Sequence, residues 1–279
     1  MGEEINSRRN PGDRMLDRYN RMLHEEIQKG DSKTPHLASV ELNGAIHIAG
    51  NSGKKRVTKN DSSKAQERVL SVTEPGTKQD LKEYGDRYKK DKRKLLASRK
   101  GTYHPEDDNL RRTTETIVNG PKTWHQLDSG GKGSLHGEMA LHEPILEYIK
   151  QKPQNEEKDS ERIYIGGVKK DCLFCHWTHA ILNEHLYAEH KTKVETSGTH
   201  GYPFPGWKAP KPLLDNKKAL EAFEEKLKEL NKIDDSGQWS INNGKVNKKE
   251  DKKPDEDRKV EGNSHNPEDS GSECESESE

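Results

Sequence analysis

Two short motifs, His136-Gly137-Glu138 and Cys172-Leu173-Phe174-Cys175, constrain the fold of this chain more than any other feature. An imidazole and two thiolates are ligands that zinc prefers. Because the two motifs are far apart in the sequence, they can share one ion only if folding brings them together. Thirty-five residues lie between His136 and Cys172, which is room for a helix, a loop, a strand and a short turn. Helix–strand–helix packing would place both helix starts at one edge of a sheet, where their positive dipole ends favour thiolates. The spacing therefore predicts an α/β domain with a metal site at that edge.

The combination H-x-E … C-x-x-C is the pattern of the zinc deaminases. It predicts that His136, Cys172 and Cys175 hold Zn²⁺ and leave a fourth position open for water. The metal would lower the pKa of that water toward neutrality and so supply hydroxide. Glu138 is predicted not to bind the metal but to carry protons from the water to a ring nitrogen and then to departing ammonia. The predicted activity is zinc-dependent hydrolytic deamination, a hydrolase reaction at a C–N bond of a cyclic amidine.

The two cysteines also begin a rival metal pattern, because His185 and His190 follow them in the spacing C-x2-C-x9-H-x4-H. This alternative is a C2H2-like zinc module that binds nucleic acid or protein without catalysis. A classical finger has about twelve residues between the second cysteine and the first histidine, so nine leave little room for its second strand. It also leaves His136 and Glu138 without a role. The two interpretations differ in which histidine holds the metal.

Hydrophobic periodicity and turn residues predict the elements around these motifs. Residues 38–42 and 45–48 have β-like apolar runs on either side of Asn43-Gly44, the strongest short hairpin signal. The segment 135–150 is predicted to be a helix that Pro144 kinks or breaks. The other predicted elements are a helix over 13–29, a loop over 101–134, a strand over 162–168, helices over 171–190 and 217–232, and a strand in 191–198.

Composition limits how much of the chain can form a packed core. Only 27% is hydrophobic and 35% is charged, against roughly 25% charged in ordinary globular domains. A compact domain flanked by solvated segments fits these values better than a single globule. The net charge of −1 hides an asymmetry, because residues 250–279 carry twelve acidic and four basic side chains while residues 1–249 carry a net +7. Two interpretations are equally open: the basic part approaches nucleic acid and the acidic tail shields that surface, or the basic part is an ordinary solvated surface and the tail only solubilises the chain.

Targeting signals and cysteine usage suggest where the protein acts. The chain has no run of about 18 apolar residues, so no membrane span is predicted, and its first residues lack the apolar stretch of a secretory signal. Three cysteines argue against a disulfide framework and favour a reducing compartment. We therefore expect a cytoplasmic site of action. A second possibility is a delivered effector that has no classical signal peptide.

The order of these elements resembles the cytidine deaminase-like superfamily, with a hairpin, a helix, H-x-E at a helix start, a strand, and C-x-x-C at the next helix start. Within that superfamily the chain resembles the bacterial toxin- and effector-type deaminases related to AID/APOBEC. The resembling phrases are AIHIAGNSG, LHGEMAL, IYIGGVKKDCLFC and SGTHGYPFPGW, which span roughly residues 37–207. The resemblance implies a three-layer α/β/α sandwich and a nucleobase of cytosine or adenine type, in nucleic acid or a nucleotide, as the substrate.

The resemblance also implies roles for particular residues. The implied zinc ligands are His136, Cys172 and Cys175, and the implied proton shuttle is Glu138. Asn51 follows the second predicted strand, where the family often places a base-binding Asn. Trp207 is a candidate for stacking on a base, although an aromatic residue at such a position is more often part of the packing.

The chain departs from the family pattern at three positions. Asp171 stands where the common pattern has Pro, Gly137 stands where it has Ala, and Pro144 lies in the helix that carries Glu138. The predicted organisation is an N-terminal helical extension (1–34), a deaminase-like domain (35–210) with a charged insert (54–134), a charged helix (211–234) and a disordered acidic tail (235–279). The charged helices and the tail are also predicted as contact sites for a protein partner.

Overall fold

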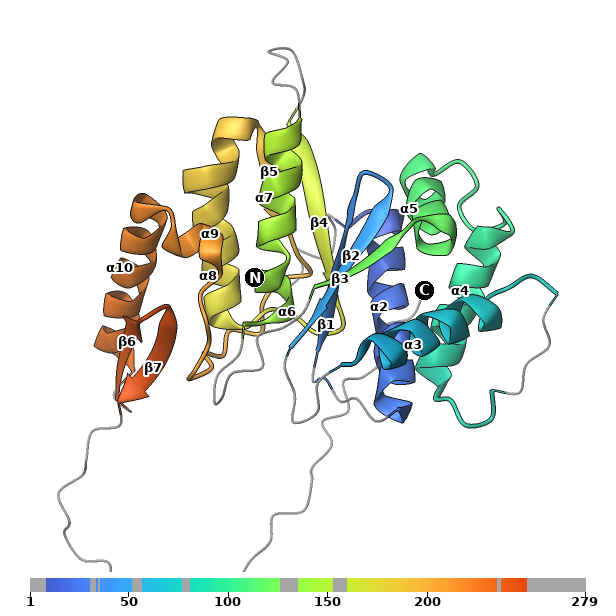
Figure 1. Ribbon diagram of the computed structural model, residues 1–279, viewed down its shortest axis with the longest axis horizontal. Helices are drawn as coiled ribbons and strands as arrows, with labels where there is room; N and C mark the ends of the chain where they lie inside the picture. The colour runs from blue at the N-terminus through green and yellow to red at the C-terminus, as the bar shows by residue number, and fades with distance from the viewer. Residues whose placement is uncertain are drawn as a thin grey trace, which may run out of the picture.

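We analysed a computed structural model, which describes residues 9–30, 34, 36–51, 57–76, 81–125, 135–152, 160–234 and 237–249. The centre of the fold is a mixed sheet with the strand order β3-β2-β1-β4-β5 (Figure 1). Strand β1 pairs antiparallel with both β2 and β4, whereas β3 and β5 each add in parallel at an edge. The strands are β1 (Leu37–Leu42), β2 (Ala45–Gly50), β3 (Lys122–His125), β4 (Glu161–Gly167) and β5 (Thr192–Glu195).

The predicted hairpin of β1 and β2 is confirmed. Asn43 and Gly44 form its turn with φ values of 49° and 71°, as a two-residue turn with both residues in the left-handed region requires. Val40 pairs with His47 at the middle of the ladder. The strands predicted over 162–168 and within 191–198 are also present, as β4 and β5.

Helices cover both faces of the sheet, so the predicted α/β/α sandwich is confirmed (Figure 1). Side chains alternate along the strands and supply two separate cores: Val40 and Ile165 belong to one, Ile48 and Tyr164 to the other. The Ile48 face is covered by α2 (Pro11–Lys29), α3 (Lys59–Val72), α4 (Asp86–Arg99) and α5 (Asp108–Asn119). The Val40 face is covered by α6 (Gly137–Ala140), α7 (His142–Gln151) and α8 (Leu173–Leu182), with α9 (Lys211–Leu214) and α10 (Lys217–Ile233) beyond them.

The segment predicted as one broken helix over 135–150 is two helices. Helix α6 ends at Ala140 and α7 begins at His142, with Leu141 at the junction. Pro144 lies in the first turn of α7, where its missing N–H costs no helical hydrogen bond. The helix predicted over 171–190 is α8 followed by a π turn (Asn183–Tyr187) and a 3-10 turn (Ala188–His190).

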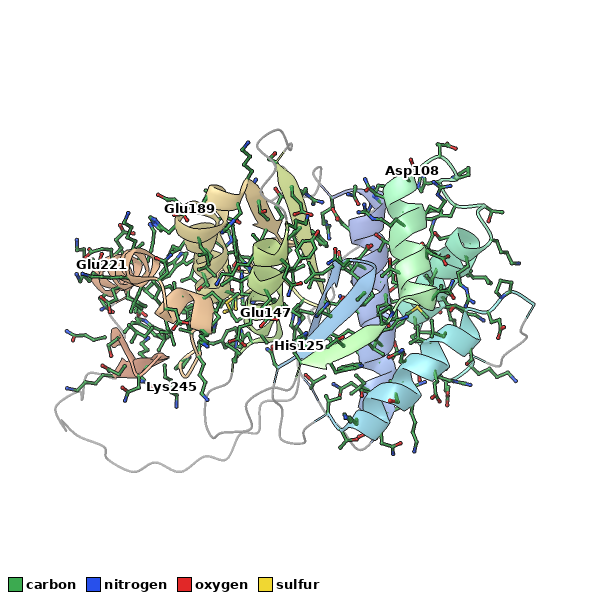
Figure 2. The ribbon with its side chains drawn as sticks, turned by 45° about the horizontal axis from the view of Figure 1, so that its top comes forward. Asp108, His125, Glu147, Glu189, Glu221 and Lys245 are labelled. Atoms are coloured by element: carbon green, nitrogen blue, oxygen red, sulfur yellow. The ribbon has the colours of Figure 1, made fainter. Side chains whose placement is uncertain are left out.

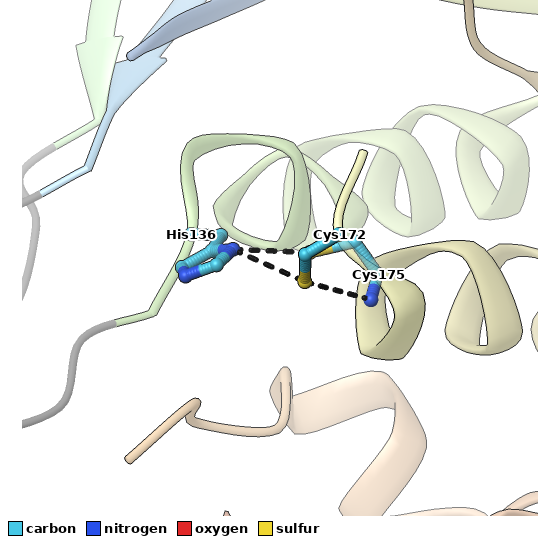
Figure 3. Close-up of side chains that lie close together, drawn as sticks. All are labelled: His136, Cys172 and Cys175. Carbon is cyan, nitrogen blue, oxygen red and sulfur yellow. Dashed lines mark hydrogen bonds between the residues drawn. The ribbon is translucent and has the colours of Figure 1, made fainter. Parts of the chain in front are cut away.

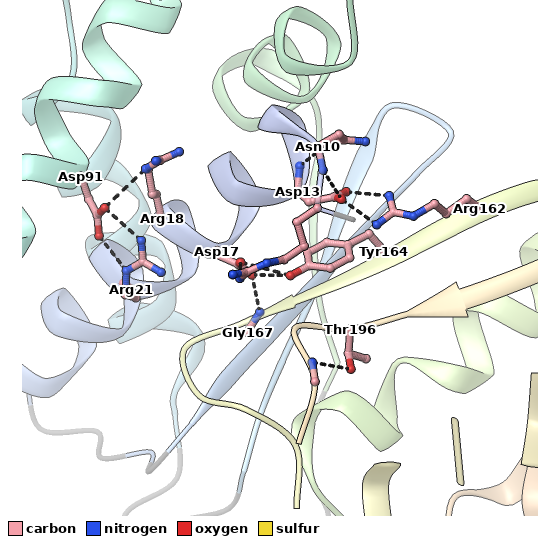
Figure 4. Close-up of polar contacts among 12 residues, drawn as sticks. Asn10, Asp13, Asp17, Arg18, Arg21, Asp91, Arg162, Tyr164, Gly167 and Thr196 are labelled. Atoms are coloured by element: carbon pink, nitrogen blue, oxygen red, sulfur yellow. Dashed lines mark hydrogen bonds and ion pairs between the residues drawn. The ribbon is translucent and has the colours of Figure 1, made fainter. Parts of the chain in front are cut away.

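Helix α2 is a part of the sandwich. The Asp17 carboxylate accepts hydrogen bonds from the Gly167 backbone N–H at 3.0 Å and from the Tyr164 hydroxyl at 3.1 Å (Figure 4). Arg162 of β4 pairs with Asp13 at 2.7 Å. Helix α2 thus packs on β4 and supplies part of one layer of the fold, and the domain boundary at residue 35 stays a prediction.

The charged insert also contributes to the core, and the loop predicted over 101–134 contains α5 and β3. Asp107 caps α5 by accepting from the Leu110 N–H at 2.7 Å. The helix has no continuous apolar stripe, because Thr113 and Thr116 are buried on its inner face and donate to the Glu41 carboxylate at 3.0 Å. Burial of threonines in place of aliphatic residues explains why periodicity failed to predict this helix.

Part of the segment predicted as a disordered tail is a second hairpin, β6 (Gln238–Asn242) and β7 (Lys245–Lys249). Its turn repeats the Asn-Gly signal of the first hairpin, with φ values of 50° at Asn243 and 70° at Gly244. Trp239 is buried with its ring centroid 5.3 Å from that of Phe174 in α8. The predicted start of disorder at residue 235 is thus wrong for 238–249, and residues 250–279 lie outside the described residues.

The two helical layers lie at opposite ends of the molecule. Figure 2 shows Glu221 of α10 and Lys245 of β7 at one end and Asp108 of α5 toward the other. Helix α10 packs on α8 through Phe223, which stacks on Trp207, so the predicted boundary at residue 210 cuts through one core. No helix in the described part of the chain is long and apolar enough to cross a bilayer.

Candidate active site

His136 lies at the start of α6, close to the end of β2. It is the N-cap of α6, and the next residue, Gly137, donates its N–H to the Asn51 Oδ1 at 2.6 Å. A Cβ on Gly137 would lie 2.8 Å from the Ala49 carbonyl oxygen, too close for a backbone contact. Glycine replaces the family's alanine because α6 approaches β2 this closely. Asn51 thus positions the backbone of the H-x-E motif, and its role in binding a base stays a prediction.

The C-x-x-C motif begins α8 directly after β4. Cys172 is the N-cap of α8, and its Sγ accepts from the Cys175 N–H at 3.4 Å. Asp171 donates its own N–H to the Gly198 carbonyl at 2.9 Å, a bond that the family's proline could not make. The buried Asp171 carboxylate accepts from the Thr196 hydroxyl at 2.6 Å. Aspartate therefore ties the start of α8 to the loop that follows β5.

The structure brings His136, Cys172 and Cys175 together (Figure 3). Nδ1 of His136 lies 3.3 Å from the Cys175 Sγ and 3.6 Å from the Cys172 Sγ, and the sulfurs are 3.4 Å apart. A tetrahedral zinc ion with bonds of about 2.0–2.3 Å needs these atoms about 3.5–3.8 Å apart. The donor set fits a metal ion after small side-chain movements. Within the described ranges, it is the one group of three His, Cys, Asp or Glu side chains found this close together.

The two thiols differ in acidity. A hydrogen bond with Cys175 and the neighbouring His136 lower the pKa of Cys172, against the burial that raises it. Burial raises the pKa of Cys175 well above that of an ordinary thiol. Metal binding would release the protons that these sulfurs hold without a metal, because both sulfurs bind as thiolates.

Glu138 is 4% exposed and is held by His36, a residue just before β1 that the sequence did not single out. Nε2 of His36 lies 2.7 Å from Oε1 of Glu138. Nδ1 of His36 accepts the Lys169 backbone N–H at 3.3 Å, and the short contact of Nε2 with the Glu138 carboxylate lies outside normal hydrogen-bond geometry. Burial alone would raise the pKa of Glu138, but His36 lowers it below the ordinary carboxyl range. Glu138 is thus a buried carboxylate beside the metal-ligand cluster.

Trp207 is a core residue and not a substrate platform. It is 1% exposed, stacks on Phe223 with ring centroids 5.3 Å apart, and donates its Nε1–H to the Cys175 Sγ at 3.3 Å. The prediction that it stacks on a base is wrong, because no ligand can reach its ring. Its contact with Cys175 instead orients one sulfur of the candidate metal-binding group.

The exposed aromatic side chains of this loop are Tyr202 and Phe204, at 70% and 46%. The Phe204 ring centroid lies 6.1 Å from that of His136, and both aromatic side chains pack around His200. The phrase THGYPFPGW contains all of these residues, but periodicity cannot tell which aromatic ring points inward in a loop.

The histidines of the alternative zinc module do not reach the cysteines. His185 follows Cys175 by ten residues along one continuous helical run, which places it about 15 Å away at 1.5 Å per residue. Neither His185 nor His190 belongs to the group of close donors in the described part of the chain.

Residues 135–211, which contain the three clustered donors, match the model of a family described as OTT_1508-like deaminase. The segment that carries the donor group is therefore similar to a deaminase family. It covers about a quarter of the chain and includes both motifs and the aromatic loop. Searches of curated proteins and of solved structures returned no match.

Proposed function

We propose that the protein is a zinc-dependent hydrolytic deaminase that acts on a nucleobase in nucleic acid or in a nucleotide. The observation that carries this proposal is the buried Glu138 carboxylate beside a His/Cys/Cys donor set, within a segment that matches a deaminase family. A donor set of this kind is the one found in the zinc deaminases, where a carboxylate that does not bind the metal moves the protons.

Each residue has a part in the proposed reaction. His136, Cys172 and Cys175 would hold Zn²⁺, which when bound supplies the Lewis acidity that activates water at neutral pH. Glu138 takes a proton from the attacking water and delivers it to the ring nitrogen. It then takes the second proton from the new hydroxyl group and gives it to the amine, which leaves as ammonia. His36 holds the carboxylate in place through its Nε2. Burial keeps bulk water from competing for these proton transfers.

The exposed aromatic pair favours a base as the substrate. Tyr202 and Phe204 are exposed, and the Phe204 ring lies edge-on to His136 with ring centroids 6.1 Å apart. Stacking of a base on an aromatic side chain contributes about 1–3 kcal/mol. The thiols of Cys172 and Cys175 are free, and both must stay reduced to bind a metal, so we propose that the protein acts in the cytoplasm.

Metal content and deamination test the proposal together. Zinc per chain is measured for wild type, His136→Ala and a His185→Ala/His190→Ala control, and ammonia release is assayed on single-stranded DNA, single-stranded RNA and free nucleosides. We expect His136→Ala to lose most of its zinc, the control to keep it, and Glu138→Gln to keep zinc but lose turnover.

Two results would contradict the proposal. Retained turnover in Glu138→Gln would show that another group moves the protons. Loss of zinc in the His185/His190 control but not in His136→Ala would favour the non-catalytic zinc module.

A further inference from the structure

The excess positive charge of residues 1–249 is concentrated in and next to one helix. Residues 86–100, which are α4 and its C-cap, contain eight basic and two acidic side chains, a net charge of +6. Residues 1–249 as a whole carry a net +7. The rest of this part of the chain therefore has a net charge close to zero, although it includes a shorter basic run at 54–59.

The charges lie on the outer side of the helix. Tyr88, Asp91 and Leu95 are the buried residues of α4. At 100° per residue, positions 90, 93 and 100 point away from this inner face. We call Arg87, Lys90, Arg93 and Lys100, all exposed, the α4 basic face. It is about 20 Å long at 1.5 Å per residue, which spans roughly six phosphates at 3.4 Å per nucleotide of one strand.

Within the described ranges, the acidic side chains of α4 pair with groups outside the α4 basic face. The inner acid, Asp91, pairs with Arg18 and Arg21 of α2 (Figure 4). For the four side chains of the α4 basic face, no ion pair with an acidic group is found among the residues that the structure describes.

Helix α10 shows the contrasting arrangement. It carries five basic and four acidic side chains. Lys217 pairs with Glu221 four residues later, and further pairs join Lys226 to Glu229 and Lys228 to Glu225. A charged helix that only needs solubility is normally built in this balanced way. On α4, like charges three and four residues apart repel one another, and binding a polyanion would relieve that repulsion.

We propose that the α4 basic face binds the phosphate backbone of nucleic acid, as a docking surface separate from the metal cluster. The α4 layer covers the opposite face of the sheet from α6 and α8, so the surface would hold a long substrate away from the site of chemistry (Figure 1). A membrane is a poorer partner, because the large exposed apolar side chains in the described part of the chain are Tyr202, Phe204, Leu214 and Ile233, none of them on α4. The proposal depends on the proposed function in one respect: only if the protein is a deaminase is the bound nucleic acid its substrate.

The test compares two variants of the full chain that each remove four positive charges. One is Arg87→Gln/Lys90→Gln/Arg93→Gln/Lys100→Gln on α4. The matched control is Lys217→Gln/Lys226→Gln/Lys228→Gln/Lys232→Gln on α10. Fluorescence anisotropy with a short labelled single-stranded DNA and the corresponding RNA gives the binding constant over a salt series, and thermal unfolding verifies that both variants are folded.

We expect the α4 variant to bind at least about tenfold more weakly than wild type at low salt. Its slope of log K against log salt should fall by roughly 0.7 for each phosphate that the variant no longer neutralises, or roughly 2–3 in all. The α10 control should bind like wild type. Equal weakening of both variants would show an effect of net charge alone. Unchanged binding of the α4 variant would show that nucleic acid binds elsewhere on the protein. Either result overturns the proposal.

The same variants separate this proposal from the proposed function. Zinc content and deamination of a free nucleoside should be unchanged in the α4 variant, because the surface does not touch the metal cluster. If polymer binding depends on α4 but no base is deaminated, the docking surface stands and the proposed function fails. If deamination occurs and the α4 variant binds the polymer normally, the docking surface fails and the proposed function stands.

Discussion

Replacing His36 by leucine tests whether this side chain holds Glu138. The two side chains are 4% and 5% exposed, and Nε2 of His36 lies 2.7 Å from Oε1 of Glu138. Neither Oε2 of Glu138 nor Nε2 of His36 has a partner with hydrogen-bond geometry in the described part of the chain, so the contact between the two side chains is a short electrostatic one. Leucine occupies a volume similar to that of the imidazole but offers no donor. The variant therefore leaves a buried carboxylate without its partner.

The size of the effect follows from burial. Removing one partner of a buried ion pair costs about 3–5 kcal/mol, whereas loss of a single hydrogen-bond partner costs about 1–3 kcal/mol. We expect about 3 kcal/mol of lost unfolding free energy, where the two ranges meet. Glu138→Gln removes the charge, so leucine at position 36 should cost less in that background, with a coupling energy of about 2 kcal/mol.

Urea denaturation of the four proteins of this double-mutant cycle, at neutral pH and equal metal content, measures the coupling. If the changes in unfolding free energy of the two single variants add up to that of the double variant within about 0.5 kcal/mol, the pairing of His36 with Glu138 is refuted. Turnover gives a second readout: kcat should fall in His36→Leu with KM little changed, because His36 positions the proton carrier and not the substrate.

Three further predictions concern the core, acid stability and the H-x-E turn. Trp207→Ala should lower the unfolding free energy by about 3–5 kcal/mol, whereas Tyr202→Ala should change it by less than about 0.5 kcal/mol and weaken substrate binding; equal urea midpoints for the two variants would contradict their opposite burial. Burial lowers the pKa of His179 to about 4, so its contribution is complete above the unfolded pKa of about 6.5 and is lost toward pH 4 at up to about 1.4 kcal/mol per pH unit. His179→Gln should flatten the dependence of unfolding free energy on pH in that window, and an unchanged slope would show that the histidine is not held neutral. Gly137→Ala should destabilise by about 1–3 kcal/mol and lower zinc occupancy, while Gly85→Ala, where a Cβ meets nothing within 4 Å, should do neither; normal zinc content in Gly137→Ala would show that α6 can move away from β2.

Local chemistry made several features of this protein predictable from its sequence. Asn43-Gly44 places both turn residues at positive φ, so the first hairpin is specified within a few residues. The H-x-E and C-x-x-C motifs specify a donor set by residue type alone, and the 35 residues between them allow the helix–strand–helix return that brings His136 to the cysteines. The same rule applied to Asn243-Gly244 would have predicted the second hairpin, but the high charge of its surroundings concealed it.

Only the tertiary structure decided which side chains surround these motifs. His36 reaches Glu138 across about a hundred residues of sequence, and the pairing depends on how β1 lies beside the start of α6. Whether Trp207 or Tyr202 faces inward depends on a core completed by α10 and the second hairpin, which no loop pattern encodes. The sequence by itself determined what chemistry this chain can carry, because ligand type and turn conformation are local properties. The tertiary structure decided which groups support that chemistry, because burial and pairing depend on residues far apart in the chain.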